Sequence, residues 1–222
     1  MNKVLVSAIV AVWVMLASPL SPADTSVGLR VGTLGGGVEI AHAFTDKLGF
    51  RVAANGLRIN GTTTYDSVDY DADLKLLTGE LLLDWFPFSG NFRVSAGAMY
   101  NGNKLTLNGK PTSGTYTING QPYNASEIGS LDGKVDFRKA APYVGLGYGR
   151  PIGKGLSLSA DFGVLFQGPP RTTLSATCGP TASPATCSQL QSDVAAQQNS
   201  LNDDMHKYQY YPVLSIGLAY VF

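Results

Sequence analysis

Charged residues are scarce in this sequence. Aspartate, glutamate, lysine and arginine make up only 14% of the 222 residues, whereas a typical soluble protein carries about 25%. Acidic and basic residues balance to a formal net charge of zero, and the sequence pI is about 6.7. A nucleic-acid-binding chain shows an excess of basic residues, so we expect no nucleic-acid partner.

Long apolar runs are also missing beyond the first 23 residues. A membrane-spanning helix needs about 20 consecutive apolar residues, so the body of the chain contains no candidate for one. Glycine is abundant, with 26 residues, and there are 11 tyrosines. Low charge without an apolar helix is typical of a transmembrane β-barrel, because alternate strand positions spread the apolar residues along the chain.

Cysteine and histidine are rare, with two of each. Cys178 and Cys187 do not form a C-x-x-C motif, and no further cysteine and few histidines are present to complete a metal site, so we expect no metal. No phosphate loop or dinucleotide-binding glycine pattern predicts a cofactor. If the chain is exported, its cysteines meet an oxidising compartment, and we then expect a disulfide between them.

The N-terminal residues form a segment of their own. Lys3 precedes an apolar run over residues 4–17, which is followed by small residues and prolines. We interpret residues 1–23 as a secretory signal peptide cleaved before Asp24, which leaves residues 24–222 as one outer-membrane barrel domain. The alternative is an uncleaved anchor, for which the run is short.

The rest of the chain alternates with a period of two residues, which predicts β-strands. We expect an all-β, eight-stranded antiparallel up-and-down barrel that crosses the membrane, with strands at residues 26–34, 37–44, 48–59, 72–86, 92–107, 132–149, 155–167 and 207–222. Three alternate connections are short, and three of the others are long. Short periplasmic turns and long outer loops are the rule for bacterial outer-membrane barrels. We expect a short helix within the last long loop, at residues 188–201.

A soluble barrel of the lipocalin type is the alternative fold, with its apolar face turned inward. Two features favour the membrane. One strand face carries charges too sparse for a solvated exterior. The other gathers aromatic residues near strand ends, as the girdles of outer-membrane barrels do: Phe44, Trp85, Phe86, Phe92, Tyr148, Phe166, Tyr210 and Tyr220.

The polar strand face then lines the lumen. Its charged residues are Arg30, Glu39, Arg51, Glu80, Asp84, Arg93 and Asp161. Buried charges are costly unless they are paired, so we expect a salt-bridged network in which Arg93 pairs with Glu80 or Asp84. The network is either a structural plug or a polar conduit whose ion pairs re-form around a small solute.

Catalysis is poorly supported, and we expect no enzyme. A barrel hydrolase or protease needs a histidine beside a nucleophile near the outer rim. His42 falls on the apolar face near an inner turn, and His206 begins the last strand. The acidic loop with Asp66, Asp69, Asp71 and Asp73 could attract cations, but its spacing is not that of an EF-hand, and a solvated loop explains it.

The C-terminal sequence LSIGLAYVF stays apolar to the last residue. Leu218, Tyr220 and Phe222 share one face with Leu214 and Ile216, as expected of a strand that faces lipid and closes the barrel. The terminal aromatic residue resembles the signal that the outer-membrane assembly machinery reads, so we expect that machinery as a partner.

Four segments resemble the CarO family of carbapenem-associated outer-membrane proteins, which are also described as ornithine-uptake porins. They are FRVSAGAMYNGNKLTL, GKVDFRKAAPYVGLGYG, ADFGVLFQGPPRTTL and NDDMHKYQYYPVLSIGLAYVF. The resemblance spans residues 27–222 but is weak in the outer loops. It implies an eight-stranded outer-membrane barrel and slow passage of small basic amino acids.

Together these observations predict a narrow porin-like channel in the bacterial outer membrane for small solutes such as basic or zwitterionic amino acids. The alternative is a non-conducting structural or adhesive barrel whose loops bind a partner. In both cases we expect contact with outer-membrane lipid and lipopolysaccharide.

Overall fold

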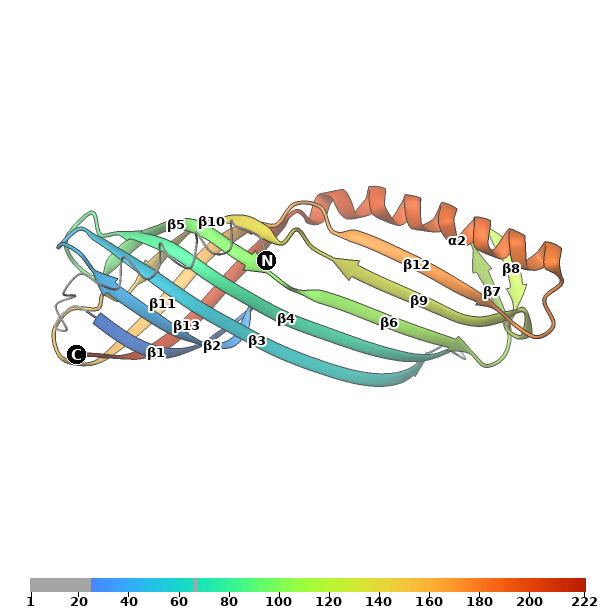
Figure 1. The fold of residues 1–222 in the computed structure, drawn as a ribbon, viewed down its shortest axis with the longest axis horizontal. Coiled ribbons are helices and arrows are strands. Elements are labelled where there is room, and N and C mark those ends of the chain that lie inside the picture. Colours follow the sequence, from blue (N-terminus) through green and yellow to red (C-terminus); the bar gives the residue numbers. More distant parts are fainter. Residues whose placement is uncertain (1–24, 66–67) are drawn as a thin grey trace, which may run out of the picture.

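The computed structural model describes residues 25–65 and 68–222, and most of them lie in β-strands (Figure 1). The predicted signal peptide, residues 1–23, lies outside the described residues. The strands are β1 (Thr25–Gly32), β2 (Gly35–Ala43), β3 (Leu48–Tyr65), β4 (Val68–Trp85), β5 (Phe92–Asn101), β6 (Lys104–Pro111), β7 (Thr115–Ile118), β8 (Gln121–Asn124), β9 (Ile128–Asp136), β10 (Ala140–Tyr148), β11 (Gly155–Phe166), β12 (Arg171–Cys178) and β13 (Tyr210–Val221).

Eight of the described strands close into a ring, in the order β4-β3-β2-β1-β13-β11-β10-β5 and back to β4. Every neighbouring pair is antiparallel. The closing contact pairs Ser26 with Val221 and Gly32 with Ser215, which places the apolar C-terminal strand between β1 and β11. Closure leaves these strands without a free edge in the ring, as a membrane-spanning sheet requires.

The two faces of the ring follow the alternation of the sequence. Outward apolar side chains are exposed, for example Leu29 at 69% and Ile216 at 65%, whereas inward side chains such as Arg51 are buried. An apolar surface of this extent is stable only in contact with lipid. Seven of the eight expected girdle residues are exposed, but Phe86 is 1% exposed. The girdle assignment of Phe86 is therefore wrong, because Phe86 directly follows the outward Trp85 and successive side chains point to opposite faces.

The predicted outer loops contain more regular structure than expected. β3 and β4 run on through the predicted loop at residues 60–71, and the predicted fifth and sixth strands each break into two. The second halves, β6 and β9, leave the ring and pair with β4 and with each other, and β12 pairs with β9. The sheet therefore has eleven strands among the described residues, and the long loops were wrongly read as irregular.

We call the part of this sheet beyond the ring the sheet extension: residues 57–65 and 68–76 of β3 and β4, with β6, β9 and β12 (Figure 1). Its polarity is the reverse of that of the ring. The face that continues the lumen carries a row of Ile59, Leu74, Leu105 and Val135. The face that continues the lipid surface carries charged and hydroxyl side chains, because alternate residues point to opposite faces. This reversal is expected where a sheet passes from lipid into water.

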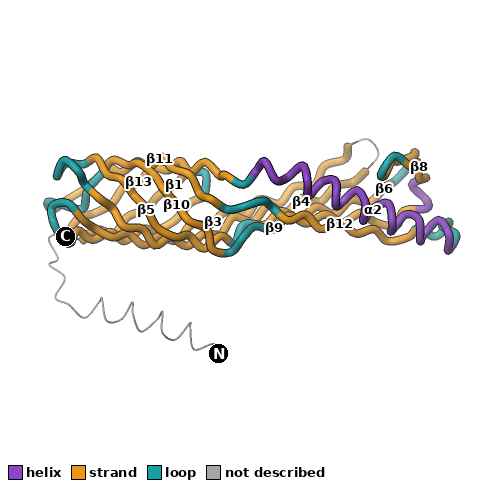
Figure 2. The backbone as a smooth tube through the Cα atoms, turned by 90° about the horizontal axis from the view of Figure 1, so that it is seen from above, coloured by secondary structure: helices purple, strands orange, loops and turns teal. Residues whose placement is uncertain are grey.

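Helix α2 (Pro184–Met205) lies along the sheet extension, away from the ring (Figure 2). It is longer than the predicted helix and begins earlier, because Ser183 caps it by accepting a hydrogen bond from the Thr186 amide at 3.0 Å. No helix in residues 25–65 and 68–222 is long and apolar enough to cross a membrane.

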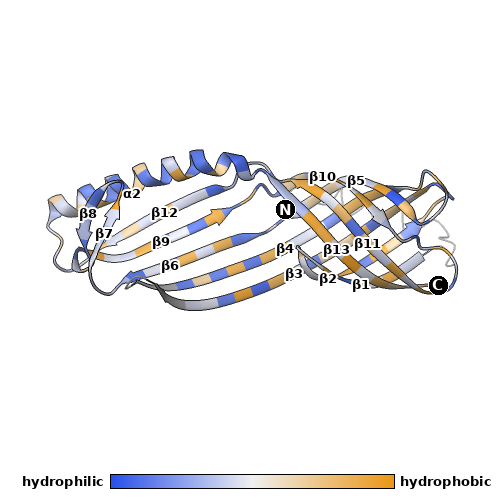
Figure 3. Ribbon diagram, turned by 180° about the vertical axis from the view of Figure 1, so that it is seen from behind, coloured by the Kyte–Doolittle hydropathy of each residue, from blue (hydrophilic) through white to orange (hydrophobic). Residues whose placement is uncertain are grey.

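Helix α2 also protects the free edge of β12. The Oδ1 atom of Asn202 accepts from the Thr172 amide at 2.7 Å, and Oε1 of Gln198 accepts from the Leu174 amide at 2.8 Å. These side chains occupy backbone donors that an edge strand otherwise offers to other chains. Hydropathy colouring shows the helix as mostly polar, whereas hydrophobic residues are concentrated on the ring strands (Figure 3).

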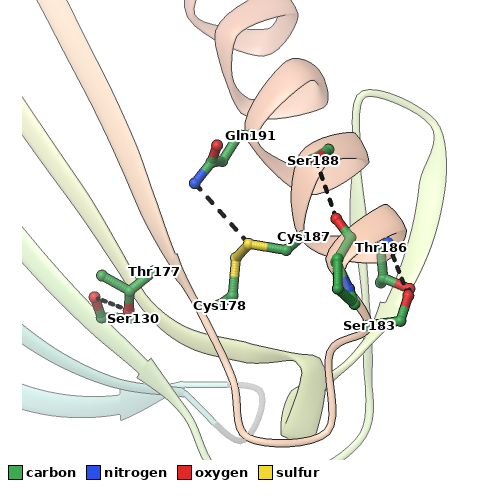
Figure 4. The surroundings of a disulfide bond; sticks show 9 residues. Ser130, Thr177, Cys178, Ser183, Thr186, Cys187, Ser188 and Gln191 are labelled. Atoms are coloured by element: carbon green, nitrogen blue, oxygen red, sulfur yellow. Dashed lines mark hydrogen bonds between the residues drawn. A yellow bond between two sulfur atoms is a disulfide. The ribbon is translucent and has the colours of Figure 1, made fainter.

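The predicted disulfide between Cys178 and Cys187 is confirmed (Figure 4). It joins the end of β12 to the first turn of α2, with 5.6 Å between the two Cα atoms. The helix contributes Leu190 and Val194 to a small apolar core with Ile118, Tyr123 and Ile128. The bond therefore fixes the start of the helix where this outer core begins.

Candidate functional site

All seven predicted lumen charges lie together inside the ring. They come from six strands, β1 to β5 and β11, and each residue is less than 9% exposed. We call this set the lumen network: Arg30, Glu39, Arg51, Glu80, Asp84, Arg93 and Asp161. It contains three guanidinium groups and four carboxylates, so the network carries one more negative than positive charge when all are ionised.

Arg51 lies at the centre of the lumen network. Its Nη1 atom is 2.8 Å from Asp161 Oδ2 and 3.4 Å from Glu39 Oε2, and its Nη2 atom is 3.2 Å from Asp84 Oδ1. Nη2 also donates to Ser95 Oγ at 3.1 Å. One guanidinium thus joins three carboxylates from three strands, which no sequence spacing predicts.

Arg30 forms a second centre. Its Nη1 atom is 3.1 Å from Glu39 Oε2 and 3.0 Å from Glu80 Oε2, and its Nη2 atom is 3.8 Å from Asp161 Oδ2. Nη2 donates to Ser215 Oγ at 2.7 Å. Glu39 and Asp161 are therefore shared between Arg30 and Arg51, so alternative pairings lie within a few ångströms.

Arg93 forms the expected ion pair with Asp84, but its shortest ion pair is with Asp161. Its Nη2 atom is 2.8 Å from Asp161 Oδ1, whereas Asp84 Oδ1 lies 3.9 Å from Nε, and no ion pair joins Arg93 to Glu80. Arg93 and Asp161 lie opposite Gly147 from its two sides. A Cβ atom on Gly147 would come within 2.7 Å of both side chains. The glycine therefore lets two charges meet across an intervening strand.

Neutral polar side chains add hydrogen bonds to carboxylates of the network. Asn55 Nδ2 donates to Glu80 Oε1 at 2.6 Å, and Ser95 Oγ donates to Asp84 Oδ1 at 2.5 Å. The sequence reasoning missed Asn55, Ser95 and Ser215, although each occupies an inward position of its strand. The predicted network contained only the charged residues of the polar strand face, so these three neutral residues were left out.

Inward apolar side chains form a second cluster inside the ring, which we call the apolar layer. It consists of Leu34, Leu82, Met99, Ala141, Tyr143, Leu165 and Val213. The Tyr143 ring lies over Gly145 and Gly163, where an added Cβ atom would come within 2.4 Å of the phenolic oxygen. These inward apolar residues were not predicted as a layer, because the sequence analysis considered only lumen charges.

Arg150, in the turn between β10 and β11, closes the end of the lumen opposite the sheet extension. Its guanidinium donates to the Ser89 carbonyl at 2.8 Å and to Asp46 Oδ1 at 3.0 Å, and it lies 5.3 Å from the centre of the Phe86 ring. Residues from the network and Arg150 line a cavity of about 20 Å³. A space of that size holds about one water molecule, so the lumen is closed in this conformation.

The other predicted residues occupy separate places. His42 lies on the outer face beside the stacked rings of Phe44 and Phe50, with ring centres 5.4 and 5.9 Å away, and its Nδ1 atom is 2.9 Å from Thr25 Oγ1. His206 begins a short 3₁₀ turn after α2. Asp66 falls outside the described residues, and the described part of the chain has no cluster of three metal-ligating side chains.

The C-terminal residues Leu218, Tyr220 and Phe222 project outward, each 47–49% exposed. The Tyr220 and Phe222 rings pack edge to face at 5.4 Å. Their side chains meet lipid rather than the lumen network, and their role as an assembly signal stays a prediction.

Comparison with solved structures identifies the same architecture elsewhere. The crystal structure of Acinetobacter baumannii CarO aligns with a TM-score of 0.60 over 90% of this chain and 98% of that one, at 21% identity. The chain has the fold of CarO. A. baumannii CarO2 aligns over the same shares of each chain, with a TM-score of 0.58 and 19% identity.

Other comparisons add no closer relation: no family model matches the sequence, and neither does a curated protein. The resemblance seen in the sequence segments is thus supported by the shared fold. At this level of identity the likeness extends to the fold alone.

Proposed function

We propose that this protein is a porin-like barrel of the bacterial outer membrane whose lumen is a closed, ion-paired gate for small amino-acid-like solutes. The observation that carries the proposal is the composition of the lumen network. A lumen that only needed filling could be packed with apolar side chains, whereas burying seven charges is costly and demands near-complete pairing.

The network offers partners for both ends of a zwitterion. Its four carboxylates exceed its three guanidinium groups by one, which favours an additional ammonium group. The Nε atoms of Arg51 and Arg93 are buried without a hydrogen-bond partner among the described residues. A solute with one ammonium and one carboxylate group could therefore replace pairs within the network as it passes.

Passage requires the network to rearrange, because the cavity beside it is only about 20 Å³. Shared carboxylates make rearrangement feasible, since Asp161 already contacts all three arginines at 2.8 to 3.8 Å. The apolar layer must open as well. We therefore expect rare, brief openings and slow uptake rather than the steady conductance of a wide porin.

The test is conductance in planar bilayers together with swelling of liposomes in ornithine, glycine or an uncharged sugar of similar size. We expect swelling in the amino acids to exceed that in the sugar. Glu80→Gln and Arg93→Ala should both change the opening frequency, because each removes one ion-pair partner. Arg58→Ala is the matched control, because Arg58 pairs with Asp73 on the exposed face of the extension.

A non-conducting barrel is the second candidate, and the filled lumen favours it. In that case the ordered sheet extension and α2 carry the function by binding a partner outside the cell. Absence of conductance and of swelling for every solute would reject the channel and leave this candidate.

A further inference from the structure

The polar face of the sheet extension begins with a row of basic side chains. Strand register places Arg58 of β3 opposite Lys75 of β4, and Lys75 opposite Lys104 of β6. The next strand, β9, places Asp136 opposite Lys104, and Arg171 of β12 lies on the other side of Asp136. On β4, Lys75 is the next outward residue beyond Leu77, toward the sheet extension. Leu77 is the last outward leucine of the ring and is 41% exposed. The cations therefore stand where the lipid-facing surface ends.

Most of these cations are unpaired. Arg58 forms an ion pair with Asp73 at 2.9 Å. Asp136 forms an ion pair with Lys134 at 2.5 Å rather than with Lys104 or Arg171. The connection between β9 and β10 adds two more exposed cations near this boundary, because the Lys139 carbonyl accepts a hydrogen bond from the Asn101 amide and Asn101 pairs with Thr78 on β4. The cations without an ion pair to any described residue are Lys75, Lys104, Arg138, Lys139 and Arg171. A chain with zero net charge thus concentrates positive charge at this boundary.

An apolar groove of about 340 Å³ runs up the outer face of β3, β4 and β5 to this boundary. Its outward lining is Val52, Gly79, Leu81, Ala98 and Tyr100, and Lys139 lies at its end. Gly79 and Ala98 form its floor. A Cβ atom on Gly79 would meet nothing closer than Tyr100 Cβ at 3.8 Å, so the glycine is not demanded by packing within the protein.

A second groove on the lipid-facing surface provides the contrast. It is larger, about 660 Å³, and runs over β1, β5, β10, β11 and β13 past Leu146, Phe162 and Ile216. No lysine or arginine lines it. Of these two grooves, the smaller one therefore combines an apolar trough with a cation, Lys139, at its outer end.

We propose that the groove beneath Lys139 and the neighbouring basic row bind one phosphorylated lipid of the outer leaflet. An acyl chain lies against Gly79 and Ala98, and the phosphate groups face Lys75, Lys104 and Lys139. Basic side chains beside a membrane attract anionic headgroups, and no ion pair to a described residue occupies Lys75, Lys104 or Lys139. The proposal concerns the outer surface and does not depend on whether the lumen conducts.

The test is native mass spectrometry of the folded barrel in detergent with diphosphoryl lipid A as the probe. We expect one lipid to bind. The triple variant Lys75→Gln, Lys104→Gln, Lys139→Gln should weaken binding about a hundredfold, at about fivefold per cation removed. Ala98→Leu should weaken it by filling the groove while leaving every charge in place.

Matched controls separate the site from general attraction. Lys154→Gln removes a cation from the opposite end of the barrel, and Ala96→Leu adds the same bulk to β5 outside the groove; both should bind like the unaltered protein. Dephosphorylated lipid A should bind weakly, and millimolar inorganic phosphate should not compete. The proposal would be overturned if the triple variant bound diphosphoryl lipid A as tightly as the unaltered protein does, or if dephosphorylated lipid A bound as tightly as the diphosphoryl form.

Discussion

Replacing Arg51 with methionine tests whether the lumen network holds the barrel together. Methionine keeps an unbranched side chain of similar length in a site that is 1% exposed but removes the charge. Three carboxylates lose a partner: Asp161 at 2.8 Å, Asp84 at 3.2 Å and Glu39 at 3.4 Å. The net charge of the network then falls by one further unit.

The expected loss follows from what remains. Removing one partner of a buried ion pair costs about 3–5 kcal/mol, because the other charge stays buried. Asp161 keeps Arg93 at 2.8 Å, and Glu39 keeps Arg30 at 3.1 Å. Only Asp84 loses its closest arginine, and its main remaining contact is the hydrogen bond from the Ser95 hydroxyl. We therefore expect the lower end of the range, a fall of about 3 kcal/mol in the free energy of unfolding.

The assay is urea unfolding of the barrel in lipid vesicles, followed by the fluorescence of Trp85. Arg58→Met is the matched control, because Arg58 forms an exposed pair with Asp73 at 2.9 Å. Exposed pairs contribute less than about 1 kcal/mol. If Arg51→Met destabilises the barrel no more than Arg58→Met does, the network is hydrated and replaceable, and the reasoning fails.

Three further predictions concern other parts of the chain. Gly163→Ala should destabilise the barrel by about 1–3 kcal/mol, because the new methyl group would lie 2.4 Å from the Tyr143 oxygen. Hydrogen bonds from Tyr123 and Asn119 lower the pKa of Asp193. Docking of α2 should therefore be strongest above the ordinary aspartate pKa and weaken as the pH falls below it, as hydrogen exchange corrected for intrinsic rates would show. Deleting Phe222 should impair membrane insertion, measured as the heat-modifiable fraction on gels.

Each of these has its own control. In a double-mutant cycle, Tyr143→Leu should recover part of the loss caused by Gly163→Ala, and additive losses would contradict the contact. Asp193→Asn should remove the acid dependence of α2 exchange, and an unchanged pH profile would exclude this carboxylate. Deleting a residue from an outer loop should leave insertion nearly normal, and an equal defect would show that Phe222 carries no special signal.

The sequence by itself determined the membrane-spanning part of the fold. Strict alternation along 92–100 and 214–222 assigns each side chain to a face, since a strand has a period of two. The inward charges and the exposed C-terminal aromatic residues could be predicted on that basis, and the Cys178–Cys187 bond could be predicted from the cysteine count and the expected export. The polar loops could not be resolved, because β6, β9 and β12 are ordered by pairing with the extended β4 and with one another beyond the ring.

Tertiary structure alone decided which charges meet. Arg93 and Asp161 lie 68 residues apart and on strands separated by β10, so only barrel closure and the missing side chain of Gly147 bring them to 2.8 Å. The closed lumen likewise depends on Arg150 folding beneath the ring and on Tyr143 lying over two glycines. A linear pattern records the face that a residue occupies, whereas contacts across a lumen depend on curvature, register and the space left by small residues.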